Sequence, residues 1–215
     1  MIEDNVRRIR EELDSVNKRV QIVAATKTRT IDEIRTCMQT GLVAAAGENR
    51  VQELTEKYDP SFRWDFIGRL QTNKVKYIIE KATLIHSLDR VGLAETIQKE
   101  CVKHVKKQDV LIEINTGEEE AKGGIFLRDL DAFLEEIACF DRIVVRGLMA
   151  VAPVYYTENE LRKTFDTVFN AFDVRKNDVF DTLSMGMSGD YLIAAKCGAT
   201  MVRPGRAIFG ERSYT

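Results

Sequence analysis

Proline, histidine and tryptophan are scarce in this sequence, which has three, two and one of them in 215 residues. Three separated prolines and no Gly/Ser-rich run leave no segment with the composition of an interdomain linker. The length also suits one large domain. We therefore expect a single domain over residues 1–215.

Long apolar runs are also missing: none approaches the roughly 18 residues that cross a membrane. Residues 1–5 have neither the basic region nor the apolar core of a secretory signal. The four cysteines are scattered with no CxxC pair, and His86 and His104 lie far apart, so we expect no metal site. Free thiols without an export signal favour a reducing compartment, and we expect a cytoplasmic protein that does not contact membranes.

The sequence has no large excess of either charge, since it contains 32 Lys and Arg and 34 Asp and Glu. No block of five or six like charges occurs. Proteins dedicated to nucleic acids usually have a strongly basic face. We expect no nucleic-acid partner.

What the sequence does contain is an alternation of helical and strand patterns. Val6, Ile9, Leu13, Val16 and Val20 recur every three or four residues, which predicts a first helix. A short, buried strand is predicted at 21–26, followed by a helix that starts at Thr30/Asp32 and closes at Gly41.

Eight strand-like runs follow this alternation, with amphipathic helices between them. Continuous apolar strands separated by such helices indicate a parallel sheet covered by helices. The count favours an α/β fold, a single (β/α)8 TIM-type barrel with an extra N-terminal helix, and an open doubly wound sheet is the competing architecture. The predicted strands are 21–26, 42–46, 64–67, 83–85, 110–114, 143–148, 182–185 and 200–202.

In either architecture ligands bind at the carboxyl ends of the strands. Lys27 directly follows the strand at 21–26. Removing water from a lysine there favours its neutral, nucleophilic amine, as a Schiff-base lysine requires. The alternative is a lysine whose ammonium reaches solvent.

The C-terminal segment has the composition of an anion site. Ser188 stands where a helix is expected to begin, and Gly205 and Arg206 follow the last strand. Free backbone N–H groups at two adjacent helix starts suit a phosphate, although Ser188 can equally be an ordinary helix cap. Arg203 ends the last strand, and either points into a pocket or forms a surface ion pair.

Three further stretches carry charge. Arg69, Lys74 and Lys76 form a basic group that suits an anion or a partner, or is simply solvated. Glu48 and Glu53 are expected on a helix surface rather than as an acid/base pair. Residues 118–124 are expected to form an exposed loop.

Several segments, in order from Val6 to Gly210, resemble the pyridoxal phosphate homeostasis proteins, a family similar to the N-terminal barrel of alanine racemase. The segments that carry the resemblance are 25–28 (ATKT), 47–53 (GENRVQE), 66–74 (FIGRLQTNK), 147–150 (GLMA), 183–190 (LSMGMSGD), 202–205 (VRPG) and 207–210 (AIFG).

The resemblance implies a fold-type III barrel that binds pyridoxal 5′-phosphate (PLP). It implies that Lys27 carries PLP as an internal aldimine, with Ser188 and the backbone around Gly205 and Arg206 holding the phosphate. Asn49 is implied beside the cofactor.

Arg203 is implied to face the pyridine nitrogen. Because arginine stays charged and only donates hydrogen bonds, it keeps that nitrogen unprotonated. The ring is then a weaker electron sink, which restrains carbanion chemistry.

The function implied is to bind, buffer and deliver PLP and to maintain vitamin B6 and amino-acid pools, without substantial catalysis and with no catalytic residue assigned. Apo forms of PLP-dependent enzymes are the expected recipients. Alanine racemases add a β domain that supplies a tyrosine base and completes a dimeric site. The sequence ends at Thr215 without such a domain, so we expect a monomer.

Two other functions remain open: a PLP-dependent amino-acid racemase or lyase, and a barrel that binds another phosphate ligand. The sequence also departs from the family at three positions. Asp65 replaces a common histidine, Ala46 an aromatic residue, and Arg206 a small or hydroxyl residue.

Overall fold

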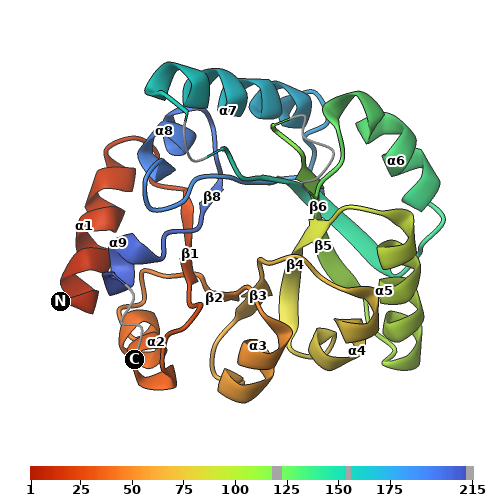
Figure 1. Cartoon of the computed structure of the whole chain (residues 1–215), viewed down its shortest axis with the longest axis horizontal. Coiled ribbons are helices and arrows are strands. Elements are labelled where there is room, and N and C mark those ends of the chain that lie inside the picture. Colours follow the sequence, from red (N-terminus) through yellow and green to blue (C-terminus); the bar gives the residue numbers. More distant parts are fainter. Residues whose placement is uncertain (118–122, 154–155, 212–215) are drawn as a thin grey trace.

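The structure, a computed structural model, describes residues 1–117, 123–153 and 156–211. In these residues eight parallel strands pair in chain order, and β8 pairs with β1 to close a barrel (Figure 1). The predicted barrel is therefore confirmed, and the open sheet is wrong. The strands are β1 (Gln21–Ala25), β2 (Ala45–Glu48), β3 (Trp64–Phe66), β4 (Ala82–Leu88), β5 (Gln108–Ile114), β6 (Ile143–Ala150), β7 (Thr182–Ser184) and β8 (Met201–Val202).

Helices surround the barrel, and the extra N-terminal helix α1 packs on α9, α2 and α8 (Figure 1). The α-helices are α1 (Ile2–Asp14), α2 (Ile31–Met38), α3 (Val51–Lys57), α4 (Val75–Ile78), α5 (Val91–Lys103), α6 (Leu130–Ile137), α7 (Glu158–Asp173), α8 (Tyr191–Lys196) and α9 (Arg206–Phe209). Short 3-10 turns precede α4 and α6, at η1 (Thr72–Lys74) and η2 (Leu127–Asp129).

Local sequence explains where several helices begin. Thr30 caps α2 in a reciprocal capping box with Glu33, as the predicted start requires, and Thr157 caps α7 with Glu160 in the same way. The first helix is shorter than its apolar spacing predicts. It ends at Asp14, and the backbone N–H of Val16 just beyond it bonds the carbonyl of Leu13 three residues back, which tightens the turn.

The second strand also begins later than predicted, at Ala45 rather than residue 42. Gly41 adopts a left-handed φ of 68° and turns the chain, and Leu42 and Val43 approach the barrel before pairing starts. This shift carries the strand two residues further, so that Glu48 belongs to β2 rather than to the loop after it.

The apolar core has two parts. A large layer lies between the strands and the helices, and a smaller one fills the barrel interior. The interior layer consists of Val23, Ala45, Leu84, Leu111, Met149 and Met201, with Ile67 packed against it. Because side chains two apart on a strand share a face, Asp65, His86, Glu113 and Arg203 also point inward.

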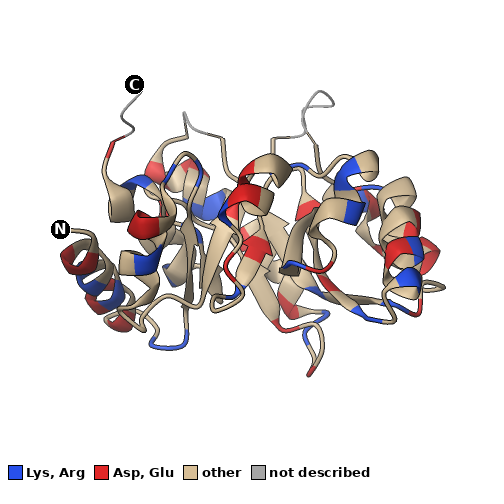
Figure 2. Ribbon diagram, turned by 90° about the horizontal axis from the view of Figure 1, so that it is seen from below, with Lys and Arg blue, Asp and Glu red and all other residues tan. Residues whose placement is uncertain are grey.

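Charges of both signs are interspersed over the outer helices (Figure 2). Across the described ranges, no helix is both long and apolar enough to span a bilayer. Nor does any group of three or more potential metal ligands gather in the part of the chain that the structure describes. The predicted loop at 118–124 falls largely on residues 118–122, outside the described residues.

Candidate functional site

All six residues expected to bind the cofactor line one cavity of about 800 Å3 at the carboxyl ends of the strands. They come from the ends of β1, β2 and β8 and from the loop before α8, which are far apart in the sequence. The six are Lys27, Asn49, Ser188, Arg203, Gly205 and Arg206. The volume lies within the range of small-molecule sites.

Lys27 is half-buried, and its amine makes no hydrogen bond or ion pair with any described residue. Its two neighbours, in contrast, are tightly held. The Thr26 hydroxyl donates to Glu48 Oε1 at 2.9 Å, and the Thr28 backbone N–H donates to Glu53 Oε2 at 2.8 Å. Thr28 also has a left-handed φ of 66°, a strained conformation for a β-branched residue. The turn therefore holds the lysine backbone and leaves its amine free.

Lys57 connects the two carboxylates behind this turn. Its Nζ lies 2.9 Å from Glu48 Oε1, 2.6 Å from Glu53 Oε2 and 3.2 Å from the carbonyl oxygen of Thr26. Burial alone raises the pKa of Glu53, but the hydrogen bonds from Lys57 and Thr28 outweigh it and hold that pKa below its usual value. We call Glu48, Glu53 and Lys57 the lysine-turn clamp.

The clamp corrects the expectation that Glu48 and Glu53 lie on a helix surface. Glu48 is fully buried in β2, and the Glu53 side chain is only 16% exposed. No sequence pattern pointed to Lys57.

Asn49 is half-buried directly after β2, and its backbone N–H donates to Glu48 Oε2 at 2.9 Å. Gly68 presses against it: a Cβ at that position would stand 2.1 Å from the Asn49 carbonyl oxygen. Residue 68 must therefore be glycine for its backbone to approach that of Asn49 so closely.

Ser188 lies three residues before the first turn of α8, so the expectation that it starts that helix is wrong. Asp190 is the cap residue instead. The Ser188 hydroxyl oxygen accepts the backbone N–H groups of Gly205 at 2.9 Å and Ala207 at 3.1 Å. It joins the two loops that were predicted to hold a phosphate, and its own O–H remains available to donate.

Arg206 contributes its backbone to this wall, whereas its side chain is 62% exposed and lies 3.8 Å from Glu211. The bulky residue in a usually small position is therefore accommodated by pointing outward. Arg29 closes the same side by donating to the carbonyl of Gly210 at 2.6 Å.

Arg203 is 4% exposed and points into the barrel, so the surface ion pair is wrong. It donates to the Ser184 hydroxyl oxygen and, at 2.9 Å, to the carbonyl of Ala150. Burial lowers its pKa to about 10, against the opposing effect of Glu113 and Asp190. It remains a cation at neutral pH.

Two carboxyl groups face this cation. Burial raises the pKa of Glu113, and Asp89 adds to the rise while Arg203 opposes it. Burial also raises the pKa of Asp190, against the hydrogen bond from the Met187 N–H. Sequence reasoning missed Glu113, which lies two residues beyond Leu111 and so on the inner face of β5.

Asp65, one of the departures from the family pattern, is fully buried. Arg63 donates to its two carboxylate oxygens at 3.1 and 3.3 Å, and His86 Nε2 lies 3.4 Å from Oδ2. The aspartate at position 65 thus pairs with the Arg63 guanidinium. A neutral histidine at that position would leave Arg63 without this anionic partner. Ala46 is also fully buried, and nothing in the structure explains why it replaces an aromatic residue.

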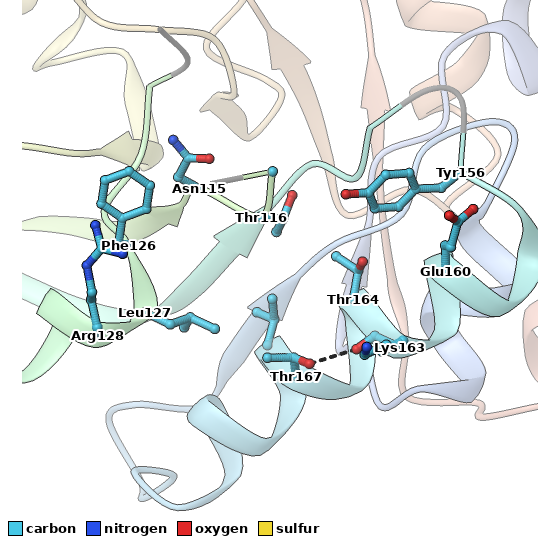
Figure 3. A pocket seen from close by; sticks show the side chains of 12 residues that line it. Asn115, Thr116, Phe126, Leu127, Arg128, Tyr156, Glu160, Lys163, Thr164 and Thr167 are labelled. Atoms are coloured by element: carbon cyan, nitrogen blue, oxygen red, sulfur yellow. Dashed lines mark hydrogen bonds between the residues drawn. The ribbon is translucent and has the colours of Figure 1, made fainter. Parts of the chain in front are cut away.

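A second cavity, of about 470 Å3, adjoins the first. Asn115 and Thr116, after β5, lie on one side of it, and Glu160, Thr164 and Thr167 of α7 on the other (Figure 3). Tyr156 lines both cavities.

The basic group after β3 does not line the main cavity. Arg69 and Lys76 are exposed, and the ammonium groups of Lys74 and Lys76 lie 5.7 and 5.0 Å from the ring centroid of Tyr77. Tyr77 is 46% exposed, so this surface combines cations with an aromatic ring.

The family model of the alanine racemase N-terminal domain matches residues 1–213. Curated relatives are similar over most of their length. The pyridoxal phosphate homeostasis protein of Aquifex aeolicus is 43% identical over 201 residues, covering 90% of this chain and 88% of the relative. The chain belongs to this family. The pyridoxal phosphate homeostasis protein of Deinococcus radiodurans is 41% identical over 198 residues, with 88% of each chain covered.

Solved structures of similar fold extend the comparison. PipY of Synechococcus elongatus with PLP bound has a TM-score of 0.87 and 28% identity, covering 98% of this chain and all of PipY. Alanine racemase of Corynebacterium glutamicum has a TM-score of 0.72 at 14% identity, and the match covers 98% of this homeostasis-family chain and 60% of the racemase. The second likeness concerns the fold alone.

Proposed function

We propose that this protein binds PLP in the main cavity and stores and delivers it, maintaining vitamin B6 and amino-acid pools. The observation that carries the proposal is the convergence of an unpaired lysine amine, a buried arginine and a hydroxyl with backbone donors in one cavity. The names of the relatives and the PLP bound to PipY support the same ligand.

The residues present fit the chemical groups of PLP. Lys27 would hold PLP through its aldehyde group, because an uncharged amine can condense with an aldehyde with loss of water. The amine is suited to this step because no described acceptor holds it. The lysine-turn clamp keeps its backbone in place.

Ser188, through its O–H, and the backbone around Gly205 and Arg206 would hold the phosphate. A doubly charged phosphate favours hydrogen bonds from hydroxyl and backbone N–H donors, which strengthen when the acceptor is ionised. Arg203 would face the pyridine nitrogen and, as a donor only, would keep it unprotonated. Asn49 would border the ring.

Storage rather than turnover follows from the residues that line the cavity. PLP bound against a fixed cation is a weak electron sink. Besides Lys27, the acid/base groups among the described lining residues are Tyr156, Asp190 and Glu211, and Asp190 is occupied by the Met187 N–H.

The decisive experiment is absorbance with PLP, then borohydride reduction and peptide mass mapping. We expect a yellow adduct whose reduced mass maps to Lys27. Lys27→Ala should abolish the colour, whereas Lys76→Ala, an exposed lysine outside the cavity, should retain it. Unchanged colour and affinity in Lys27→Ala would contradict the assignment.

Delivery is tested with an apo PLP-dependent enzyme. The loaded protein should restore its activity faster than an equal concentration of free PLP does. Lys76→Ala and Tyr77→Ala test whether the basic, aromatic surface after β3 takes part. Equal rates from loaded protein and free PLP would refute delivery.

The alternative is a PLP-dependent racemase or lyase, for which Tyr156, one of the acid/base residues that line the cavity, is the candidate to exchange a proton. The loaded protein, incubated with L-alanine in deuterated water, should leave the α-proton in place. Exchange above the rate with free PLP, lost in Tyr156→Phe, would favour the enzyme.

A further inference from the structure

A row of hydrogen-bonded side chains links Arg203 to Arg63 across the barrel interior. Most of this row lies outside the lining of the cavity. Arg203 Nη1 contacts Ser184 Oγ, and Ser184 Oγ lies 3.2 Å from His86 Nδ1. His86 Nε2 lies 3.4 Å from Asp65 Oδ2, and Arg63 holds the same carboxylate. Ser184, His86 and Asp65 are all fully buried.

The donors and acceptors favour one arrangement of protons. A guanidinium only donates, so Ser184 Oγ accepts from Arg203 and its own proton is left to donate. His86 Nδ1 is the acceptor in reach, and it therefore carries no proton. The imidazole proton is then on Nε2, which donates to the Asp65 carboxylate.

We propose that Asp65 and His86 are positioning residues for Arg203, because they hold the imidazole neutral with its proton on Nε2 and so turn the Ser184 hydroxyl oxygen toward the guanidinium. What this positioning of Arg203 means for PLP rests on the proposed function, in which Arg203 is the group placed at the pyridine nitrogen. The arrangement itself concerns only this chain and is measurable without any ligand.

The surrounding charges favour a neutral imidazole. Burial lowers the pKa of His86, and Arg203 and Arg63 lower it further, whereas Asp65 raises it. A protonated His86 would also turn a second donor onto Ser184 Oγ and leave the serine proton without a described acceptor. Arg63 donates to both oxygens of Asp65 and so fixes the carboxylate that lies against His86 Nε2.

The first test is nitrogen-15 NMR of the imidazoles in the protein without PLP. The sequence has two histidines, so each is assigned by one substitution. We expect His86 to keep an unprotonated Nδ1 and a protonated Nε2 between about pH 5.5 and about pH 8, where an ordinary histidine titrates. The exposed His104, whose Nδ1 lies 3.1 Å from Glu80 Oε1, serves as the internal reference. A proton on His86 Nδ1 at neutral pH would overturn the proposal.

The second test is a double-mutant cycle on His86 and Ser184, read out in two ways. Loss of one hydrogen bond of about 1.4 kcal/mol corresponds to about tenfold in affinity. His86→Leu and Ser184→Ala should each weaken PLP binding about tenfold, and the double variant should lose about tenfold rather than a hundredfold. Without PLP, the Arg203 side-chain N–H signals should exchange faster with water in each variant.

Asp109→Asn is the matched control, because Asp109 is a partly buried carboxyl group whose charge acts on Arg63 but which forms no hydrogen bond in the row. It should leave the His86 tautomer and Arg203 exchange unchanged, whereas Asp65→Asn should alter both. Additive losses in the cycle, or unchanged Arg203 exchange in His86→Leu, would refute the proposal. If PLP binds nowhere near Lys27, the proposed function fails, and the NMR and exchange measurements still decide on the row.

Discussion

Lys57 Nζ and Glu48 Oε1 lie 2.9 Å apart behind the turn that presents Lys27. The carboxylate is fully buried and the lysine side chain is 14% exposed. Removing one partner of such a pair leaves the other charge in a poorly solvated place. The same pair thus contributes to the stability of the fold and holds the turn that presents Lys27.

Glu48→Gln should destabilise the protein measurably. Lys57 retains Glu53, so we expect a loss of about 1–3 kcal/mol, the cost of an unsatisfied buried polar group, rather than the larger cost of an isolated buried charge. Urea unfolding measures it. Glu56→Gln, at an exposed position of α3, the helix that carries Lys57, is the control and should change stability little. Equal stability of the two variants would contradict the role of the clamp.

Glu53→Gln should destabilise the protein in a pH-dependent way. The pKa of Glu53 is held below its ordinary value of 4.5, so its stabilising effect is present above pH 4.5 and fades as pH falls through the lowered pKa. The difference from wild type in unfolding free energy should therefore shrink in acid. A difference that stays constant down to the acid transition would show that ionised Glu53 is not the cause.

Glu113→Gln should act with the opposite sign. Burial raises the pKa of Glu113, so the ionised group destabilises the fold above its ordinary value of 4.5 and not below it. The variant should be more stable than wild type at neutral pH, and the gain should vanish as pH falls below 4.5. The same urea titrations at several pH values test both carboxylates, and a loss of stability at neutral pH in Glu113→Gln would be contrary to this expectation.

Ser188→Ala should distinguish phosphate binding from ring binding. Loss of a hydrogen bond to a charged group costs about 1.5–3 kcal/mol, so PLP should bind about ten- to a hundredfold more weakly. Pyridoxal, which lacks the phosphate, should bind wild type and variant alike. Ser15→Ala, at the exposed end of α1, serves as the control. A matching loss for pyridoxal would place Ser188 elsewhere than at the phosphate.

Thiol labelling should modify one cysteine of the folded protein. Cys139 is exposed, whereas Cys37, Cys101 and Cys197 are buried. Burial raises the pKa of Cys37 to about 12 and that of Cys197 to about 11, which keeps both thiols protonated. Mass spectrometry after brief labelling checks this, and rapid labelling of Cys37 would indicate local opening of α2.

The barrel was predictable from sequence because strand and helix patterns are local and their alternation admits few architectures. The cavity residues were predictable because parallel strands bring their carboxyl ends together. The limits of the elements were less so: the first helix stops at Asp14 although its apolar spacing continues to Val20, since spacing records burial and not backbone hydrogen bonding.

The clamp and the row of buried side chains could not be predicted in this way. Lys57 reaches Glu48 from a helix, and Ser184 meets His86 from 98 positions away. Such contacts depend on which inner positions face one another once the barrel is closed. The raised pKa of Glu113 likewise appears only when its depth in the barrel is known.

The apolar layer of Val23, Ala45, Leu84, Leu111, Met149 and Met201 blocks the barrel beneath the cavity. A charged cofactor therefore has to arrive and depart at the rim formed by the carboxyl ends of the strands. In the proposed delivery, a recipient enzyme would have to dock at that rim, and while docked there it would shield the proposed imine from bulk water until the handover.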